Sequence, residues 1–286
     1  WVRALYPVLG PERDIPAPDV NTTPEIIGWM ADEYEKITGD SRNAAFTGKP
    51  LDNGGSEGRD VATGVGGFYV FEALRKNMKL PDSVTVVIQG TGNVGAGAAK
   101  IFWEHGHKIL AMSDSKSGVY AENGLDPAQV ERYKKENSSL KGFPNAGEVS
   151  NEKLLELECD ILIPAALENQ ITKKNAINIK AKALLELANG PTTTEADDVL
   201  YKKGIHVVPD ILANSGGVIV STYEWEQNLK NEHWSAKDVL EKLRILLERE
   251  SQHVWDTGVR LKTDLRRAAF AVALERLEEA LQAKEL

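Results

Sequence analysis

Cysteine is almost absent from this chain, and basic residues are outnumbered by acidic ones. Cys159 is the single cysteine among 286 residues, which excludes a disulfide framework and predicts a reducing compartment, the cytoplasm. The 34 Lys and Arg residues stand against 43 Asp and Glu residues, giving a formal net charge of −9. A chain of this charge is a poor candidate for binding the phosphate backbone of nucleic acids.

Long apolar runs and metal-binding spacings are also lacking. The longest apolar stretches, such as Ile161–Leu167, are far shorter than the ~20 residues of a membrane-spanning helix, so no membrane partner is expected. The five histidines show no pair four residues apart on one predicted helix, and no metal site is predicted. The chain opens on Trp1 without Met or a secretory leader, and we expect further residues to precede it.

The middle of the chain alternates between strand and helix patterns, which is typical of a doubly wound α/β sheet. Beyond Asn214 only helical patterns follow. The predicted strands are Val84–Ile88, Lys108–Met112, Asp160–Ile163, Ala183–Leu187 and His206–Val208. The predicted helices begin near Pro24, Asp60, Ala96, Pro127, Asn151, Thr194, Gly216, Ala236 and Leu261. The sequence therefore predicts a Rossmann-type sheet with C-terminal helices.

A glycine pattern follows the first predicted strand directly. Residues 90–95 read Gly-Thr-Gly-Asn-Val-Gly, so that Gly90, Gly92 and Gly95 form a G-x-G-x-x-G pattern between a strand and a helix. The first glycine permits a tight turn, the second lets a pyrophosphate approach the backbone, and the third allows close helix–strand packing. The free N–H groups at the start of the next helix then hold the anion. A plain structural turn is the alternative interpretation.

An acidic residue stands where a ribose hydroxyl group would be bound. Asp114 ends the next predicted strand, 19 residues after Gly95, and an acid there can accept a hydrogen bond from a ribose 2′-hydroxyl group. This favours NAD as the cofactor. Because Ser113, Ser115 and Lys116 offer room for a 2′-phosphate, NADP stays possible. The alternative is that Asp114 is an ordinary turn residue.

Several longer motifs are spread along the chain. They are Asp14–Val20, Thr47–Pro50, Gly54–Ser56, Gly58-Arg59, Ala62–Gly64, Ala188–Thr193, Pro209–Val218, Ser221 and Glu224-Trp225. In this order they resemble the glutamate dehydrogenase family, which includes dehydrogenases of Leu, Phe and Val. The resemblance covers about the C-terminal two thirds of that family. It implies NAD(P)-dependent, reversible oxidative deamination of L-glutamate to 2-oxoglutarate and ammonium, and a hexameric assembly.

The resemblance assigns roles residue by residue. Asp19 matches the catalytic aspartate that shuttles protons, although an Asp after two prolines otherwise indicates a turn. The cofactor-binding matches are Thr63, Asn93 with its neighbour Val94 in the glycine pattern, and Asn189 near the nicotinamide carboxamide. The substrate-binding matches are Asn214, Val218 and Ser221, of which Ser221 bonds the substrate's side-chain carboxylate in the family. Their spacing of four and three residues predicts one face of a helix.

One expected part of the family pattern is not found in this sequence. The family's glycine-rich stretch with the catalytic and substrate-binding lysines has no match, and the same segment builds most of the hexamer contacts. We therefore expect residues 1–46 to be a remnant of the substrate domain, 47–230 the NAD(P)-binding domain, and 231–286 C-terminal helices packing back on the cleft. We also expect this chain alone to be impaired in turnover. The alternatives are a dinucleotide-binding fragment without turnover and a dehydrogenase of an apolar amino acid.

Overall fold

A computed structural model of the chain describes residues 1–19 and 22–283. Contacts between Cα atoms divide it into two compact units. Unit 1 combines Trp1–Ala62 with Gly216–Ile245, and unit 2 combines Thr63–Ser215 with Leu246–Leu286. These limits differ from the three segments expected from the sequence. The expected segments were defined by function and not by compactness, and they stay a prediction.

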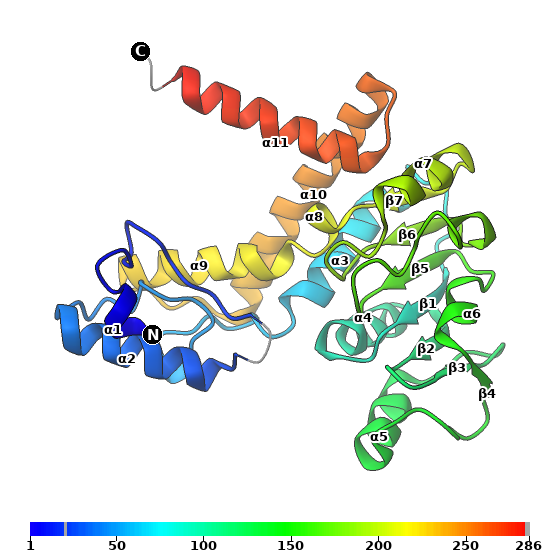
Figure 1. Ribbon diagram of the computed structural model, residues 1–286, viewed down its shortest axis with the longest axis horizontal. Coiled ribbons are helices and arrows are strands. Elements are labelled where there is room, and N and C mark those ends of the chain that lie inside the picture. Colours follow the sequence, from blue (N-terminus) through cyan, green and yellow to red (C-terminus); the bar gives the residue numbers. More distant parts are fainter. Residues whose placement is uncertain (20–21, 284–286) are drawn as a thin grey trace. The chain divides into compact units, whose positions relative to one another are not determined.

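Unit 2 contains a sheet of seven strands in the order β4-β3-β2-β1-β5-β6-β7 (Figure 1). The five strands that pair in parallel are β1 (Thr85–Gln89), β2 (Lys108–Ser113), β5 (Ile161–Pro164), β6 (Ala183–Leu185) and β7 (His206–Val208). All five lie within two residues of the predicted ranges. After β1 the chain builds β2 on one side, and later β5, β6 and β7 on the other. The strand order therefore reverses at β1, as in a doubly wound fold.

The sequence pattern missed two strands at one edge of the sheet. Strands β3 (Gly118–Tyr120) and β4 (Gly147–Val149) add to β2 in antiparallel fashion. Each has three residues, which is too short for a recognisable alternation of apolar and polar side chains. The sheet is therefore mixed at this edge, while its parallel part is as predicted.

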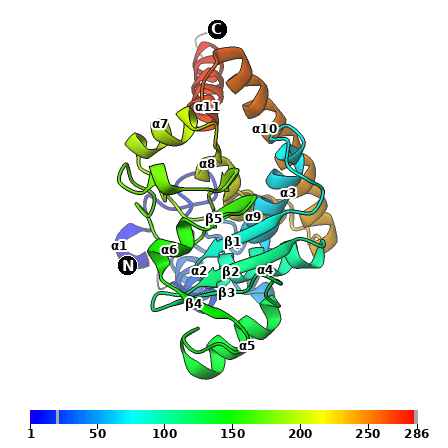
Figure 2. The same ribbon diagram turned by 90° about the vertical axis from the view of Figure 1, so that its right-hand side faces the viewer.

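Helices cover both faces of the sheet, with α6 (Asn151–Leu155) and α4 (Asn93–Glu104) on opposite sides of it (Figure 2). Helix α7 (Thr194–Lys202) shares an apolar core with α6 and with inward-facing residues of the strands. On the other side, α3 (Ala62–Arg75) and α4 meet through phenylalanine rings. These contacts are made by Phe68, Phe71 and Phe102, whose ring centroids lie 4.9–6.1 Å apart.

Four further helices are found, and two of them differ from their predicted ends. They are α5 (Pro127–Asn137), α8 (Asp210–Ala213), α10 (Ala236–Leu261) and α11 (Leu265–Gln282). Helix α10 runs past its predicted end at Trp255, until Lys262 adopts a positive φ of 53°. Helix α11 begins four residues later than predicted, because the Asp264 side chain accepts a hydrogen bond from the N–H of Arg267 and caps it. Helix α11 packs against β7 and α8.

Unit 1 is mainly helical and has its own apolar core. It contains α1 (Val2–Leu5), α2 (Pro24–Thr38), the short 3-10 helix η1 (Leu51–Asn53) and α9 (Gly216–Lys230). Helix α2 is as predicted, with Thr23 as its N-cap, Pro24 in its first turn and Gly39 in a left-handed conformation at its end. The core residues are Val2, Leu9, Ile27, Ala31, Tyr34, Ala45 and Phe46.

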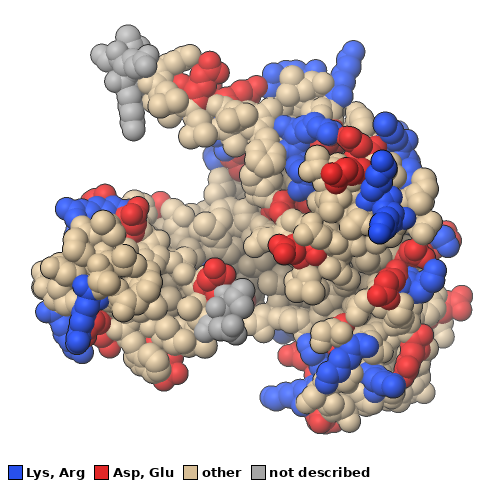
Figure 3. All heavy atoms as spheres, viewed as in Figure 1, with Lys and Arg blue, Asp and Glu red and all other residues tan. Residues whose placement is uncertain are grey.

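Charged side chains of both signs are interspersed on the face shown in Figure 3. Within the part of the chain that the structure describes, no helix is long and apolar enough to span a membrane.

Candidate active site

The glycine turn lies where the strand order reverses. It connects the end of β1 to the start of α4, and the loop after the neighbouring strand β5 touches it. Gly90 has φ +106°, and a Cβ atom there would lie 2.7 Å from the carbonyl oxygen of Ala165. A Cβ on Gly95 would lie 2.1 Å from the carbonyl oxygen of Gly90. Both glycines are thus required by the fold itself, at the crevice where doubly wound sheets bind their ligands.

Gly92 differs from both because nothing in the protein requires it. Its φ of −75° and ψ of −175° are open to any residue, and a Cβ atom there would meet no atom within 4 Å. It is exposed and forms the N-cap of α4, without a side-chain cap. A bare backbone at this place leaves the first N–H groups of α4 open to an anion. Gly92 therefore has the property expected of the glycine that faces a pyrophosphate.

Two other predicted cofactor residues lie in the first turn of α4, which begins three residues earlier than expected. Asn93 is exposed and Val94 half-buried. The start of α3 lies against this turn, since a Cβ on Gly64 would lie 3.4 Å from the carbonyl oxygen of Val94. Thr63 precedes Gly64 in α3, so the end of α3 that contains it lies against the first turns of α4. The structure brings these predicted residues together although up to 32 positions separate them.

Asp114 lies directly after β2, as predicted, but its carboxylate already has partners. Oδ1 accepts hydrogen bonds from the N–H groups of Lys116 and Ser117, at 2.7 and 2.8 Å, and Oδ2 accepts one from Leu140 at 2.7 Å. Burial alone would raise the pKa of Asp114, but these three donors and the nearby Lys134 outweigh it and lower the pKa. The carboxylate therefore organises its own turn, and its predicted bond to a ribose stays a prediction.

Asn189 and Asn214 are brought together in unit 2. The Nδ2 atom of Asn214 donates a hydrogen bond to Oδ1 of Asn189, over 2.7 Å. The predicted helix face shared by Asn214, Val218 and Ser221 is wrong for Asn214, which forms the C-cap of α8. Helix α9 begins only at Gly216, because the helical conformation is interrupted at Asn214 and Ser215, between α8 and α9.

Ser221 in unit 1 has a cationic neighbour. It is buried on α9, whereas Val218 of the same helix is 65% exposed. The Nε atom of Arg59 donates a hydrogen bond to Ser221 Oγ over 2.9 Å. Burial lowers the pKa of Arg59, and Glu224 partly opposes this effect. A half-buried guanidinium group beside a hydroxyl group is suited to binding a carboxylate.

A buried ion pair one turn further along α9 holds the Thr47–Pro50 motif. The Lys49 Nζ atom lies 2.6 Å from Glu224 Oε1, and both side chains are completely buried. The Glu224 carboxylate also accepts hydrogen bonds from the N–H groups of Gly48 and Lys49, at 2.9 and 3.2 Å. Pro18 packs on Gly48 so closely that a Cβ there would lie 2.2 Å from its ring. Asp19, the residue after Pro18, is exposed, and its catalytic role stays a prediction.

A family model described as Glutamate/Leucine/Phenylalanine/Valine dehydrogenase matches residues 54–284, and the model of that family's dimerisation domain matches residues 1–36. The chain belongs to this dehydrogenase family. The resemblance inferred from its motifs is thereby confirmed, and so is the Rossmann-type α/β fold.

Named relatives of this dehydrogenase include enzymes specific for either cofactor. An NADP-specific glutamate dehydrogenase of Synechocystis is 45% identical over 294 residues, covering 99% of this chain and 69% of that protein. The catabolic NAD-specific glutamate dehydrogenase RocG of Bacillus subtilis is 41% identical over 282 residues, covering 98% of this chain and 66% of that protein. The chain thus spans about two thirds of these relatives.

Solved structures of glutamate dehydrogenases have the same fold. The hetero-hexameric enzyme of Thermus thermophilus in its leucine-bound form superposes with a TM-score of 0.93 at 36% identity, covering 99% of this chain and 67% of that one. The enzyme of Peptoniphilus asaccharolyticus gives a TM-score of 0.87 at 37% identity, with 99% and 68% covered. These similarities extend over both compact units of the dehydrogenase chain.

One cation near the glycine turn was missed from the sequence. Lys134 of α5 donates a hydrogen bond from Nζ to the carbonyl oxygen of Thr91, over 2.5 Å. It lies 43 residues from Thr91, and only the packing of α5 on α4 brings it there. Nothing local distinguishes Lys134 from its neighbour Lys135, so the sequence offered no signal for it.

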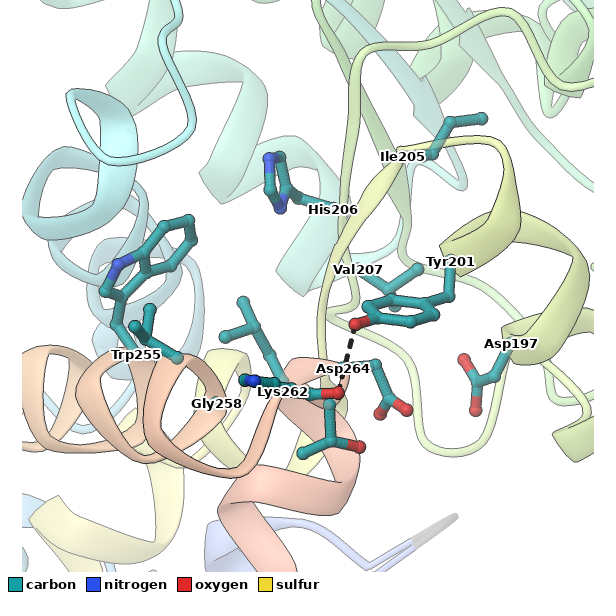
Figure 4. Close-up of a pocket in the computed structure, with 12 residues that line it drawn as sticks. Asp197, Tyr201, Ile205, His206, Val207, Trp255, Gly258, Lys262 and Asp264 are labelled. Atoms are coloured by element: carbon teal, nitrogen blue, oxygen red, sulfur yellow. Dashed lines mark hydrogen bonds between the residues drawn. The ribbon is translucent and has the colours of Figure 1, made fainter.

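A cavity of about 250 Å³ in unit 2 lies away from the glycine turn (Figure 4). Its lining includes Tyr201, His206, Trp255 and Asp264, and Tyr201 donates a hydrogen bond to the carbonyl oxygen of Lys262 over 3.3 Å. None of the residues predicted to bind cofactor or substrate lines it. Among residues 1–19 and 22–283, no group of three or more acidic, His or Cys side chains is placed to hold a metal ion.

Proposed function

We propose that this chain takes part in the NAD(P)-dependent, reversible oxidative deamination of L-glutamate to 2-oxoglutarate and ammonium, and that it supplies the cofactor-binding part. The observation that carries the proposal is Gly92, which lies at the start of α4, where the strand order reverses. It is exposed, and neither its backbone conformation nor its neighbours require a glycine there. The names of the relatives, all glutamate dehydrogenases, support the same activity.

L-Glutamate is the proposed substrate because of the pair formed by Arg59 and Ser221. An apolar side-chain pocket, as needed for leucine or valine, gains nothing from a guanidinium group and a hydroxyl group 2.9 Å apart. A second carboxylate on the substrate would pair with both groups. The alternative of a dehydrogenase for an apolar amino acid is disfavoured on this ground.

Both cofactors are proposed to bind, with NAD the first candidate. Asp114 beside the ribose would repel a 2′-phosphate, but its carboxylate is occupied by three N–H donors. Lys134 lies close enough to Asp114 to lower its pKa and adds a positive charge at the same place. We further propose a cytoplasmic location for this chain.

The proposed site residues keep the roles that the glycine pattern and the family resemblance gave them. The cofactor would be bound by Thr63, Gly90, Gly92, Asn93, Val94, Gly95 and Asn189. Bound NAD(P) would supply a carbon that takes up or releases the hydride. Asn214, Val218 and Ser221 would bind the substrate, and Asp19 would move protons if the bound substrate shields its carboxylate from water.

The first experiment is a titration of the purified chain with NADH and then NADPH, followed by nicotinamide fluorescence. Saturable binding of either cofactor is the expected result, and no binding of either would overturn the proposal. An assay of 2-oxoglutarate amination by the chain alone then decides between an enzyme and a binding fragment without turnover.

Substrate choice is tested separately with Ser221→Val, which removes the hydroxyl group from α9. We expect 2-oxoglutarate to bind about tenfold more weakly to the NADH complex, because the Ser221 hydroxyl is lost and Arg59 loses its partner. The matched control is Thr222→Val, whose hydroxyl group is exposed and donates to the carbonyl oxygen of Val218. Tighter binding of 2-oxoglutarate than of the oxo acid of leucine by the unaltered chain is required by the proposal.

A further inference from the structure

Arg266, in the first turn of α11, is surrounded by three carboxylates from three other elements of unit 2. Its Nε atom lies 2.6 Å from Asp197 of α7, and its Nη1 atom 2.9 Å from Asp210 of α8. Its Nη2 atom lies 2.8 Å from both carboxylate oxygens of Glu186, at the end of β6. Every nitrogen of the guanidinium group is therefore used in a fixed geometry.

Two of these carboxylates hold backbone groups next to the predicted nicotinamide site. Glu186 accepts a hydrogen bond from the N–H of Asp210 at 3.0 Å, and Asp210 accepts one from the N–H of Gly190 at 2.8 Å. Gly190 directly follows Asn189, which in turn accepts the hydrogen bond from Asn214. A continuous chain of contacts thus runs from Arg266 to both asparagines.

The surroundings make Arg266 difficult to replace. Glu186 is completely buried and Asp197 nearly so. Burial raises the pKa of both carboxyl groups, and Arg266 acts against that rise. Without the guanidinium group, Glu186 would be a buried charge without its counter-ion, and the loop that follows it would lose its anchor.

We propose that Arg266 is a positioning residue that holds Asn189 and Asn214 in place for the nicotinamide end of the cofactor. This inference rests on the proposed function, which places Asn189 beside the carboxamide. Asp197 ties the same guanidinium group to α7, where it also lines the cavity of Figure 4. Arg266 thereby links the C-terminal helix to a cofactor contact made elsewhere in unit 2.

A simpler role for Arg266 would be to hold α11 against the rest of unit 2, but another arginine of α11 has that role as well. The next residue, Arg267, also joins α11 to α7, through a 2.8 Å ion pair with the exposed Asp198, and it pairs with Asp264 of its own N-cap. The hydrogen bonds of the Arg267 side chain go to Asp198 and Asp264 instead of Glu186 and Asp210. Arg267 therefore provides a matched control for the effect of losing a helix-docking arginine.

The experiment compares a ligand that has the nicotinamide ring with one that lacks it. Dissociation constants of NADH and ADP-ribose are measured for the unaltered chain and for Arg266→Lys, Asp210→Asn and Arg267→Lys. Lysine keeps the charge, but its single ammonium nitrogen cannot reproduce the planar fork whose three nitrogens reach three carboxylates. Asp210→Asn removes the charge shared by Arg266 Nη1 and the N–H of Gly190. It leaves Arg266 paired with Glu186 and Asp197, which keeps the test valid if Arg266→Lys does not fold.

We expect NADH to bind about tenfold more weakly to Arg266→Lys and to Asp210→Asn, a loss of about 1.4 kcal/mol. ADP-ribose should bind within about twofold of the unaltered chain, because its contacts lie at the glycine turn. Arg267→Lys should change neither constant. Equal losses for both ligands, or unchanged NADH binding by the first two variants, would overturn the inference. If the unaltered chain binds neither ligand, the proposed function fails as well, and this result is distinct from the others.

Discussion

The carboxylate of Asp114 connects three backbone N–H groups from two segments of unit 2, the turn after β2 and the loop at Leu140. At this site one residue matches a cofactor-binding pattern and also performs a structural task. Its lowered pKa arises because three donors outweigh the effect of burial. A group with a lowered pKa in the folded state stabilises the fold when it is ionised.

Replacing Asp114 by Asn tests this structural task. We expect the free energy of unfolding at pH 7 to fall by about 1–3 kcal/mol, because an amide NH2 group then faces at least one N–H donor. The contribution is fully present above the unfolded pKa of about 3.9 and is lost as the pH falls through the lower folded value. Urea unfolding at pH 7 and at about pH 3 measures both effects. A difference between the two proteins that is independent of pH would contradict the explanation.

At the scale of the elements, the glycines in and before α4 are of two kinds. Gly90 and Gly95 are required by their conformation or their close contacts, whereas Gly92 and Gly97 both have open space where a Cβ atom would lie. Gly92 is the N-cap of α4, and Gly97 lies inside the helix. The two residues therefore form a natural pair for separating ligand binding from stability.

We expect Gly92→Ala to fold normally and to weaken NADH binding at least about tenfold, because its methyl group blocks the approach of the pyrophosphate. Gly97→Ala should bind NADH normally and raise the free energy of unfolding by about 0.5–1 kcal/mol, since alanine favours a helix interior. Fluorescence titration and urea unfolding check both variants. Normal NADH binding by Gly92→Ala would show that the glycine turn faces no ligand.

Helix α9 supplies a second prediction at this scale, through the buried pair of Lys49 and Glu224. Lys49→Met leaves the Glu224 carboxylate with only two N–H donors and should lower the free energy of unfolding by about 3–5 kcal/mol. In the double variant with Glu224→Gln, we expect a loss smaller than the sum of the two single losses by at least about 1 kcal/mol. Additive losses in urea unfolding would mean that the pair is not coupled.

For the whole molecule, cofactor binding should stabilise the fold that forms the site. NADH at about 100 times its dissociation constant is expected to add about 2.7 kcal/mol to the free energy of unfolding. For a unit of this size, the unfolding temperature would rise by roughly 5–10 °C. Gly92→Ala at the same NADH concentration is the control and should shift far less. An equal shift in both proteins would place the NADH site elsewhere.

The sequence by itself determined the features that depend on neighbouring residues. Three such features can be recognised from residues only a few positions apart. They are the apolar runs of the parallel strands, the Thr23 cap before Pro24, and the glycine turn at residues 90–95. These features were sufficient to predict the Rossmann-type fold and the position of the glycine turn between β1 and α4. The short edge strands β3 and β4 were not predicted, because three residues are too few to show an alternation of apolar and polar side chains.

The tertiary structure decided which charged side chains meet. Lys49 pairs with Glu224 over 175 positions, Arg59 with Ser221 over 162, and Arg266 with Glu186 over 80. It also gave Asp114 a partner in Leu140. A buried charge pairs with whichever side chain the fold brings next to it. Because the two partners are so far apart in sequence, no local pattern indicates that they meet. The sequence therefore specified the glycine turn, while only the packing of distant segments showed what holds the residues around it.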